Sequence, residues 1–202
     1  MNSSLIRITL FPINISILPD ELVPLHIFED RYKNMVSDSL NNNKEFGIIY
    51  KRDKEIKNIG CSVFIKKVYQ KYDDGKYDIL VQGKDRFEIK SLFKKNNLWV
   101  GEIEFINELY DKVDRNKFNK VLDKYLKLLL TFNIDHDIQS EMNKKISFDF
   151  TKNILIPNNI KQDFLELPNE SDRIIFIDKF LDSIIKKSKK ENNKLFKGKL
   201  HN

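Results

Sequence analysis

The sequence is poor in the residues that build disulfides, metal clusters and flexible linkers. It holds one cysteine, Cys61, with six glycines and five prolines, and it contains no alanine. A single cysteine excludes an internal disulfide and a multi-cysteine metal site, and it is typical of a reducing compartment. No run of about 18 apolar residues occurs, so the sequence predicts no transmembrane helix.

The amino-terminal segment does not fit a secretory signal peptide. Such a signal needs a basic start, an unbroken apolar stretch and a small-residue cleavage site. Here Arg7 and Asn14 interrupt the apolar residues, Pro12 lies among them, and no Ala-x-Ala follows. The sequence therefore predicts a cytoplasmic protein.

The net charge of +6 is concentrated at the carboxyl end of the chain. Residues 186–202 contain seven lysines and one acidic residue, Glu191, so the rest of the chain is neutral overall. Nucleic-acid-binding domains usually carry a basic excess over one face. The neutral body argues against a nucleic-acid partner, and residues 188–202 are predicted to form a basic, disordered tail.

The first half of the chain has the residue pattern of β-strands. One helix is expected over 29–40, and the Asp74-Gly75 dipeptide predicts a hairpin turn. Strands are expected over 5–11, 46–50, 62–69, 76–82, 85–90 and 98–106.

The second half changes to a helical period. From Asp114, a residue type that caps helices, apolar residues recur every three to four positions up to Phe132. Further helices are expected over 141–155, 158–166 and 170–187. Strands followed by helices predict an α+β fold, with a β-rich subdomain over 1–110 and a helical subdomain over 111–187.

Several motifs in the first ninety residues carry a family resemblance. Leu10-Phe11-Pro12 and Leu18-Pro19 precede the block Leu22-Val23-Pro24-Leu25-His26-Ile27-Phe28-Glu29-Asp30-Arg31-Tyr32, and Gly83-x-x-Arg86-Phe87-x-Ile89 follows it. This order resembles the Lon N-terminal domain family, the substrate-recognition domain of the Lon protease, which also occurs as a stand-alone protein. Weaker matches at Lys161-Gln162 and Arg173-Ile174 extend the resemblance over most of the chain.

The resemblance implies both a fold and a function. The fold would be a β-rich, PUA-like barrel subdomain followed by a helical bundle. The function would be non-enzymatic recognition of unfolded or exposed hydrophobic polypeptide segments, as an adaptor in protein quality control beside a separate ATPase or protease. Because some PUA-like folds bind RNA, an RNA-binding module is the alternative.

The catalytic parts of the Lon protease are not expected here. No Gly-x-x-x-x-Gly-Lys-Ser/Thr motif occurs, and too few residues follow the last expected helix to hold a protease domain. We therefore expect a stand-alone binding domain without the ATPase and protease domains.

The candidate binding residues lie in the signature block and just before it. Residues 15–22 are expected to form an exposed apolar loop, or alternatively to pack beneath the helices. An open sheet edge or such a loop would equally serve a homodimer. The expected binding residues are Ile17, Leu18, Leu22, Pro24, His26, Phe28, Arg31 and Tyr32.

The block also admits a polar site formed by His26, Glu29 and Arg31. The structural interpretation, which we favour, places Leu25, Ile27 and Phe28 in the core and uses the acidic residues at a helix start.

A thiolate–imidazole pair of Cys61 with His26 is a second chemical possibility, which would make the protein a small-molecule hydrolase. A lone cysteine beside Gly60 is more typical of a small buried residue. We therefore predict no catalytic residue, no metal and no cofactor.

Overall fold

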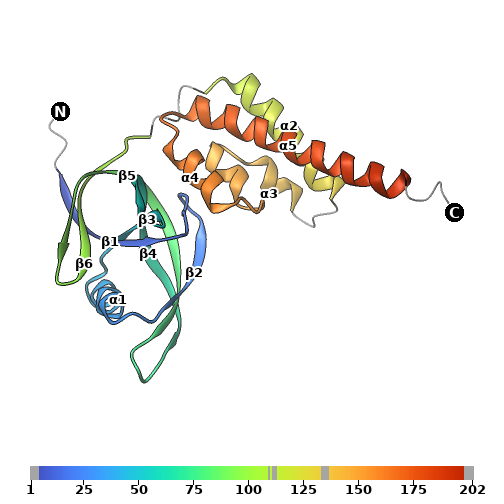
Figure 1. The fold of residues 1–202 in the computed structure, drawn as a ribbon. Coiled ribbons are helices and arrows are strands. Elements are labelled where there is room, and N and C mark those ends of the chain that lie inside the picture. The colour runs from blue at the N-terminus through green and yellow to red at the C-terminus, as the bar shows by residue number, and fades with distance from the viewer. Residues whose placement is uncertain (1–4, 109, 111–112, 133–136, 198–202) are drawn as a thin grey trace. The chain divides into compact units, whose positions relative to one another are not determined.

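The computed structural model describes residues 5–108, 110, 113–132 and 137–197 (Figure 1). The chain forms two compact units: the first combines residues 1–107 with 155–166, and the second combines residues 108–154 with 167–202. The α+β class expected from the sequence is confirmed, because a mixed sheet of strands is followed by a helical region. The subdomain boundary at residue 110 stays a prediction.

A six-stranded mixed sheet forms the first unit, and five of its strands curl into a ring (Figure 1). The spatial order is β2-β5-β4-β3-β1-β6, and a further pairing of β5 with β6 closes the ring. β1 and β3 pair in parallel, and the other pairs are antiparallel. The strands are β1 (Ile6–Ile13), β2 (Leu22–Ile27), β3 (Phe46–Arg52), β4 (Glu55–Lys71), β5 (Tyr77–Lys95) and β6 (Leu98–Phe105).

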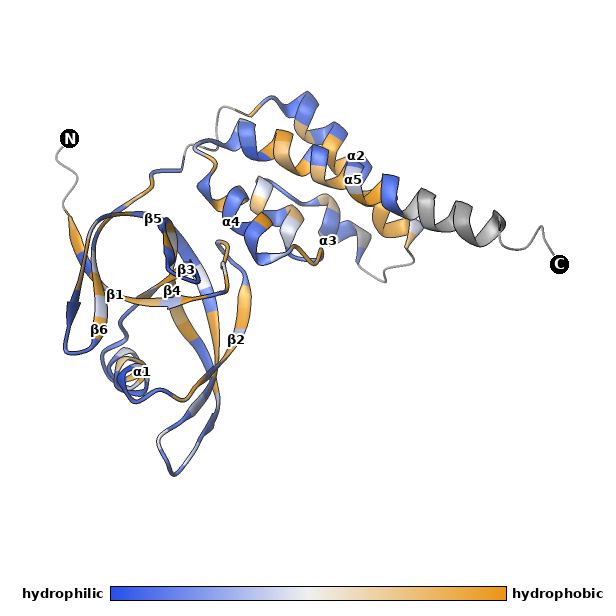
Figure 2. Cartoon of the chain, viewed as in Figure 1, coloured by the Kyte–Doolittle hydropathy of each residue, from blue (hydrophilic) through white to orange (hydrophobic). Residues whose placement is uncertain are grey.

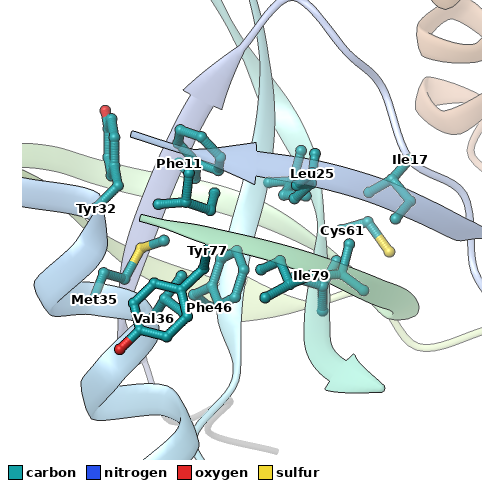
Figure 3. Close-up of a cluster of buried hydrophobic side chains, with 14 residues drawn as sticks. Phe11, Ile17, Leu25, Tyr32, Met35, Val36, Phe46, Cys61, Tyr77 and Ile79 are labelled. Carbon is teal, nitrogen blue, oxygen red and sulfur yellow. The ribbon is translucent and has the colours of Figure 1, made fainter. Parts of the chain in front are cut away.

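The core of this unit lies inside the ring and under one helix, α1 (Asp30–Asn42). The helix contributes Tyr32, Met35 and Val36, which pack with strand residues such as Phe46 and Ile79 (Figure 3). Burying one large apolar side chain stabilises a fold by about 1.5–3 kcal/mol, so this cluster fixes α1 against the sheet.

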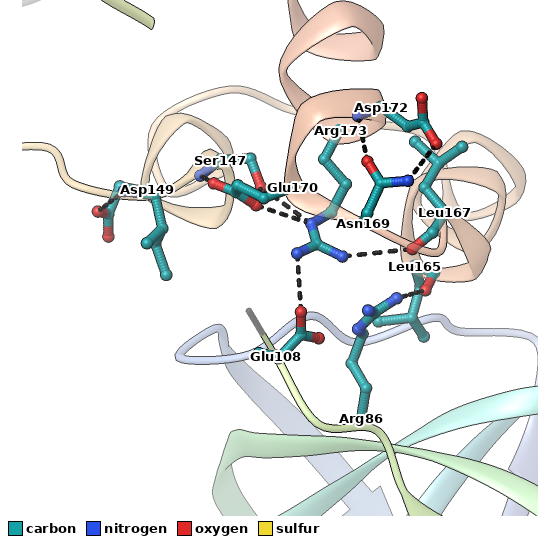
Figure 4. Close-up of polar contacts among 11 residues, drawn as sticks. Arg86, Glu108, Ser147, Asp149, Leu165, Leu167, Asn169, Glu170, Asp172 and Arg173 are labelled. Carbon is teal, nitrogen blue, oxygen red and sulfur yellow. Dashed lines mark hydrogen bonds and ion pairs between the residues drawn. The ribbon is translucent and has the colours of Figure 1, made fainter. Parts of the chain in front are cut away.

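The helix α4 (Asn158–Glu166) belongs to the same unit. Its buried Gln162 accepts a hydrogen bond from Ser16 Oγ at 3.0 Å and donates one through Nε2 to the Ile59 carbonyl at 3.0 Å. Arg86 of β5 donates to the carbonyl of Leu165 (Figure 4). The helix expected over 158–166 is confirmed, and these hydrogen bonds join it to the strands.

The second unit is helical. α2 (Arg115–Thr131) and α5 (Glu170–Lys197) contact each other, and Figure 2 shows hydrophobic residues on both helices. Both contribute buried apolar residues, among them Tyr125 and Leu181. The Asp114 side chain accepts hydrogen bonds from the backbone N–H groups of Asn116 and Lys117, which confirms the predicted N-cap. The remaining elements of this unit are α3 (Ile138–Met142) and a 3₁₀ turn, η1 (Ser147–Thr151).

A buried arginine organises the helical unit (Figure 4). Arg173 donates from Nε to Glu170 Oε2 at 2.9 Å and from Nη2 to Glu108 Oε2 at 2.7 Å. Glu170 in turn accepts hydrogen bonds from the backbone N–H and the hydroxyl of Ser147. Removing one partner of such a buried pair typically costs about 3–5 kcal/mol, so the network holds η1 against α5.

The prediction of one helix over 141–155 is wrong. The structure has the short α3 and η1 there, because the Asp149 carboxylate accepts hydrogen bonds from the backbone N–H groups of Lys145 and Ile146. Such side-chain contacts compete with helical hydrogen bonding.

Three other boundaries differ from the sequence-based expectations. The strands expected over 76–82 and 85–90 form the single strand β5, and residues 22–27 form β2, which was not expected. α5 continues past residue 187 to Lys197, while residues 198–202 lie outside the described part of the chain. The prediction of a disordered tail stays a prediction.

A glycine in the middle of β5 joins this strand to the segment that precedes β2. The Gly83 N–H donates to the Glu21 carbonyl at 2.9 Å, and its carbonyl accepts from the Asp20 N–H at 3.0 Å. A Cβ atom on Gly83 would lie 2.1 Å from the backbone oxygen of Leu18. The close approach of the two backbones therefore requires glycine at this position.

Gly83→Ala is expected to lower the free energy of unfolding by about 1–3 kcal/mol, because the methyl group would displace the backbone at Leu18. Urea denaturation followed by circular dichroism measures this. Lys84→Ala is the matched control, since it removes only a half-exposed side chain paired with Glu45, worth under about 1 kcal/mol. Equal losses in the two variants would contradict the account.

Candidate functional site

The strand β2 turns alternate side chains to the core and to solvent. Leu25 and Ile27 are buried, whereas Leu22, Pro24 and His26 are exposed, as expected for a period of two. Leu22 is 52% exposed, and Phe28, the residue after the strand, is 59% exposed. β2 therefore presents a row of large apolar side chains to solvent.

The pairing register places residues of two further strands, β5 and β4, beside the residues of β2. β5 lies beside β2, and β4 lies beside β5 on its other side, so residues of the three strands form successive rows. Adjacent strands are about 4.8 Å apart, so each row is about 10 Å wide. The rows are Leu22, Gln82 and Phe64; Pro24, Leu80 and Lys67; and His26, Asp78 and Gln70. We call these residues, with Phe28 and Tyr72, the outer β2 face.

A small polar cluster lies at one end of the outer β2 face. His26 Nδ1 lies 2.6 Å from Asp78 Oδ1, and the Tyr72 hydroxyl donates to Asp78 Oδ2 at 2.6 Å. The His26 ring stacks on Phe28, with ring centroids 6.0 Å apart. The hydrogen bonds from Tyr72 and His26 lower the pKa of Asp78, so its carboxylate is ionised at neutral pH. The Asp78 carboxylate therefore holds His26 and Tyr72 together at this end of the face.

Two of the expected binding residues are buried rather than exposed. Ile17 and Leu18 are each 1% exposed. Ile17 packs in the main core cluster with Leu25, and Leu18 lies where its carbonyl contacts Gly83. The expectation of an exposed apolar loop is therefore wrong for these two residues.

The other expected binding residues divide between the outer face and the core. Leu22, Pro24, His26 and Phe28 lie on the outer β2 face, so the expectation that Phe28 fills the core is wrong. Tyr32 is in the core, where its ring centroid lies 4.3 Å from that of Phe11 (Figure 3).

Arg31 serves the start of α1 rather than the outer face. Its Nε donates to Glu29 Oε2 at 2.9 Å, and its guanidinium lies 4.8 Å from the Tyr32 ring centroid. Arg31 therefore forms an ion pair with Glu29. The polar site of His26, Glu29 and Arg31 does not form, because His26 pairs with Asp78 instead.

The structure does not bring Cys61 and His26 together. Cys61 is fully buried in the main core cluster, whereas His26 faces solvent. Burial raises the pKa of the Cys61 thiol well above its usual range. The thiol therefore remains protonated at neutral pH and is a packing residue, not a nucleophile.

The fold is that of an α+β domain in which an additional strand on a barrel-like ring carries an exposed apolar face. The family model described as the ATP-dependent protease La (LON) substrate-binding domain matches residues 7–183. The chain belongs to this family. Comparison with curated protein sequences finds no match.

Two solved structures share the fold. The Lon N-terminal domain protein from Xanthomonas campestris is 20% identical, covers 84% of this chain and 95% of its own, and has a TM-score of 0.66. The N-terminal domain of Mycobacterium avium complex Lon protease is 14% identical, covers 87% of this chain and 98% of its own, and has a TM-score of 0.72. Within the described residues, no helix combines the length and the apolar character needed to cross a bilayer.

Tyr72→Phe is expected to raise the pKa of Asp78 toward its ordinary value of 3.8, since the Tyr72 hydrogen bond is the largest cause of the lowered value. A lowered folded-state pKa adds stability above the ordinary pKa, and this stability is lost as pH falls through the folded-state pKa. The variant should therefore lose less stability on acidification. A carbon-13 NMR titration of the carboxyl group measures the pKa.

Tyr69→Phe is the control for this titration, because Tyr69 is an exposed tyrosine of β4 that is not hydrogen-bonded to Asp78. It should leave the pKa of Asp78 unchanged. An unchanged pKa in Tyr72→Phe as well would contradict the described cluster.

Proposed function

We propose that this chain binds unfolded or exposed hydrophobic segments of polypeptides at the outer β2 face, as a recognition domain and not as an enzyme. Membership in the Lon substrate-binding family supports the class of ligand. The proposed binding position is supported by the exposed apolar side chains of Leu22, Pro24 and Phe28. The bound segment would then pass to a separate ATPase or protease in protein quality control.

The energetics of the outer β2 face fit such a ligand. Large apolar side chains gathered on a surface mark interaction sites more often than single exposed ones do. Fully burying a leucine or phenylalanine side chain is worth about 1.5–3 kcal/mol, and Leu22 and Phe28 each keep about half of their surface exposed. Covering both side chains would therefore contribute on the order of 1.4 kcal/mol or more, a tenfold change in affinity.

The position of β2 bears on how a segment would bind. Among the described strands, β2 pairs with β5 alone, so its other edge is open to strand addition. Pro24 lies in the middle of β2, however, and a proline has no N–H to donate to an added strand. We therefore favour capture of apolar side chains across the outer face over extension of the sheet.

The test is fluorescence anisotropy of a labelled, permanently unfolded polypeptide titrated with the protein. The double variant Leu22→Ser, Phe28→Ser should raise the dissociation constant about tenfold or more, because it removes both exposed apolar anchors. Since neither side chain belongs to the core, circular dichroism should show an unchanged fold.

A matched control is Ile6→Ser with Phe105→Ser. These residues are also one aliphatic and one phenylalanine, both exposed, and they lie on β1 and β6 at another part of the ring. Affinity should be retained in this variant. Equal loss in both double variants, or binding retained in both, would contradict the assignment to the outer β2 face.

Excess unlabelled RNA and a second salt concentration complete the experiment. Binding to apolar side chains should resist both, whereas binding to nucleic acid falls steeply with salt. Loss of polypeptide binding under both conditions would instead support the RNA-binding alternative.

A further inference from the structure

Two lysines border the outer β2 face without an acidic partner. Lys66 Nζ donates to Gln82 Oε1 at 3.2 Å and lies 5.9 Å from the Phe64 ring centroid. Lys67 Nζ lies 5.0 Å from the Tyr69 ring centroid. Across the described part of the chain, no carboxylate lies within ion-pair distance of either ammonium group. Both positive charges are therefore uncompensated.

Some other lysines of the same unit are paired with carboxylates. Lys84 binds Glu45, Lys90 binds Glu88 and Lys161 binds Glu21. The single acidic residue among the paired rows, Asp78, is already engaged by His26 and Tyr72. Lys71 and Lys94 of the same unit also lie over aromatic rings and form no ion pair among the described residues, so what distinguishes Lys66 and Lys67 is their position beside the apolar row.

The register sets the distance between the apolar row and the charges. Lys67 lies in the same cross-strand row as Pro24, two strands away. Lys66 is hydrogen-bonded to Gln82, which pairs with Leu22. Two strand spacings are about 10 Å. An extended chain advances about 3.3 Å per residue, so about three residues connect an apolar anchor on β2 with a charge near β4.

We propose that the outer β2 face selects hydrophobic segments that carry acidic residues about three positions from the apolar core. This inference rests on the proposed function and names its class of ligand. Carboxylates would form the ion pairs that Lys66 and Lys67 lack, and basic residues at the same positions would be repelled. The aromatic rings beneath the ammonium groups keep both charges at the face.

The experiment compares three labelled peptides that share one apolar core and differ in the residues three positions from it, which are aspartate, serine or lysine. The aspartate peptide should bind about three- to tenfold more tightly than the serine peptide, as expected for two exposed ion pairs, and the lysine peptide more weakly. The difference should shrink in 0.5 M salt, because exposed charges are screened over roughly 4 Å at that concentration.

Charge reversal on the protein tests the named residues. Lys66→Glu with Lys67→Glu should invert the preference, and Lys66→Ala with Lys67→Ala should abolish it while serine-peptide binding persists. The matched control is Lys94→Glu with Lys95→Glu, which changes the net charge equally in the part of β5 that pairs with β6. This control should retain the preference for aspartate.

The outcomes separate this inference from the proposed function. If the serine peptide binds through Leu22 and Phe28 but the three peptides bind equally, the charge selection is wrong and the proposed function stands. If the serine peptide does not bind at all, the proposed function fails, and any remaining binding of the aspartate peptide is electrostatic association alone. If the double variant Lys66→Ala with Lys67→Ala still prefers the aspartate peptide, the proposed charge selection is also wrong.

Discussion

The register between β2 and β5 determines which side chains of β2 reach solvent, and a backbone contact at Gly83 sets that register. The two hydrogen bonds between Gly83 and residues 20–21 bring the chain alongside β5 just before β2 begins. A shift of one residue would reverse the two faces of the strand, burying Leu22 and exposing Leu25. The exposed apolar row therefore depends on a glycine that is not itself part of it. The Leu18 oxygen occupies the space that any other side chain would need.

Contacts with α4 also hold the segment before β2 in place. Ser16 bonds to Gln162, Glu21 forms an ion pair with Lys161, and both partners lie on α4. Between these two anchors, Ile17 and Leu18 are both buried. A segment held at both ends against a helix and a strand stabilises the barrel unit, whereas its large exposed apolar side chains begin only at Leu22. Residues that stabilise the core and residues proposed to bind a ligand are thus only a few positions apart in the sequence.

Local signals account for much of the fold, and long-range pairing accounts for what was missed. Asp74-Gly75 predicts the β4–β5 hairpin, and Asp114 with the apolar period after it predicts α2. β2 was missed because its apolar residues surround Pro24, and only its pairing with β5 shows that it is a strand. The approach of Tyr72 and Asp78 to His26 likewise depends on that pairing, so no sequence spacing could indicate it. Asp149 broke a predicted helix through hydrogen bonds that periodicity does not report.

Alternation along β2 lets one short strand stabilise the fold and face a ligand at the same time. Leu25 and Ile27 supply core contacts, while Leu22 and Phe28 lie outside the core, so folding does not depend on the residues proposed to bind. Substitutions at the two sets should therefore have different effects: changes at Leu25 or Ile27 act on stability, and changes at Leu22 or Phe28 act on recognition.

The edge position of β2 adds a constraint, because an open apolar strand can pair with other chains. Pro24 removes one backbone donor from that edge, and the lysines on β4 add charge of one sign. Both features disfavour self-association while leaving the apolar side chains accessible.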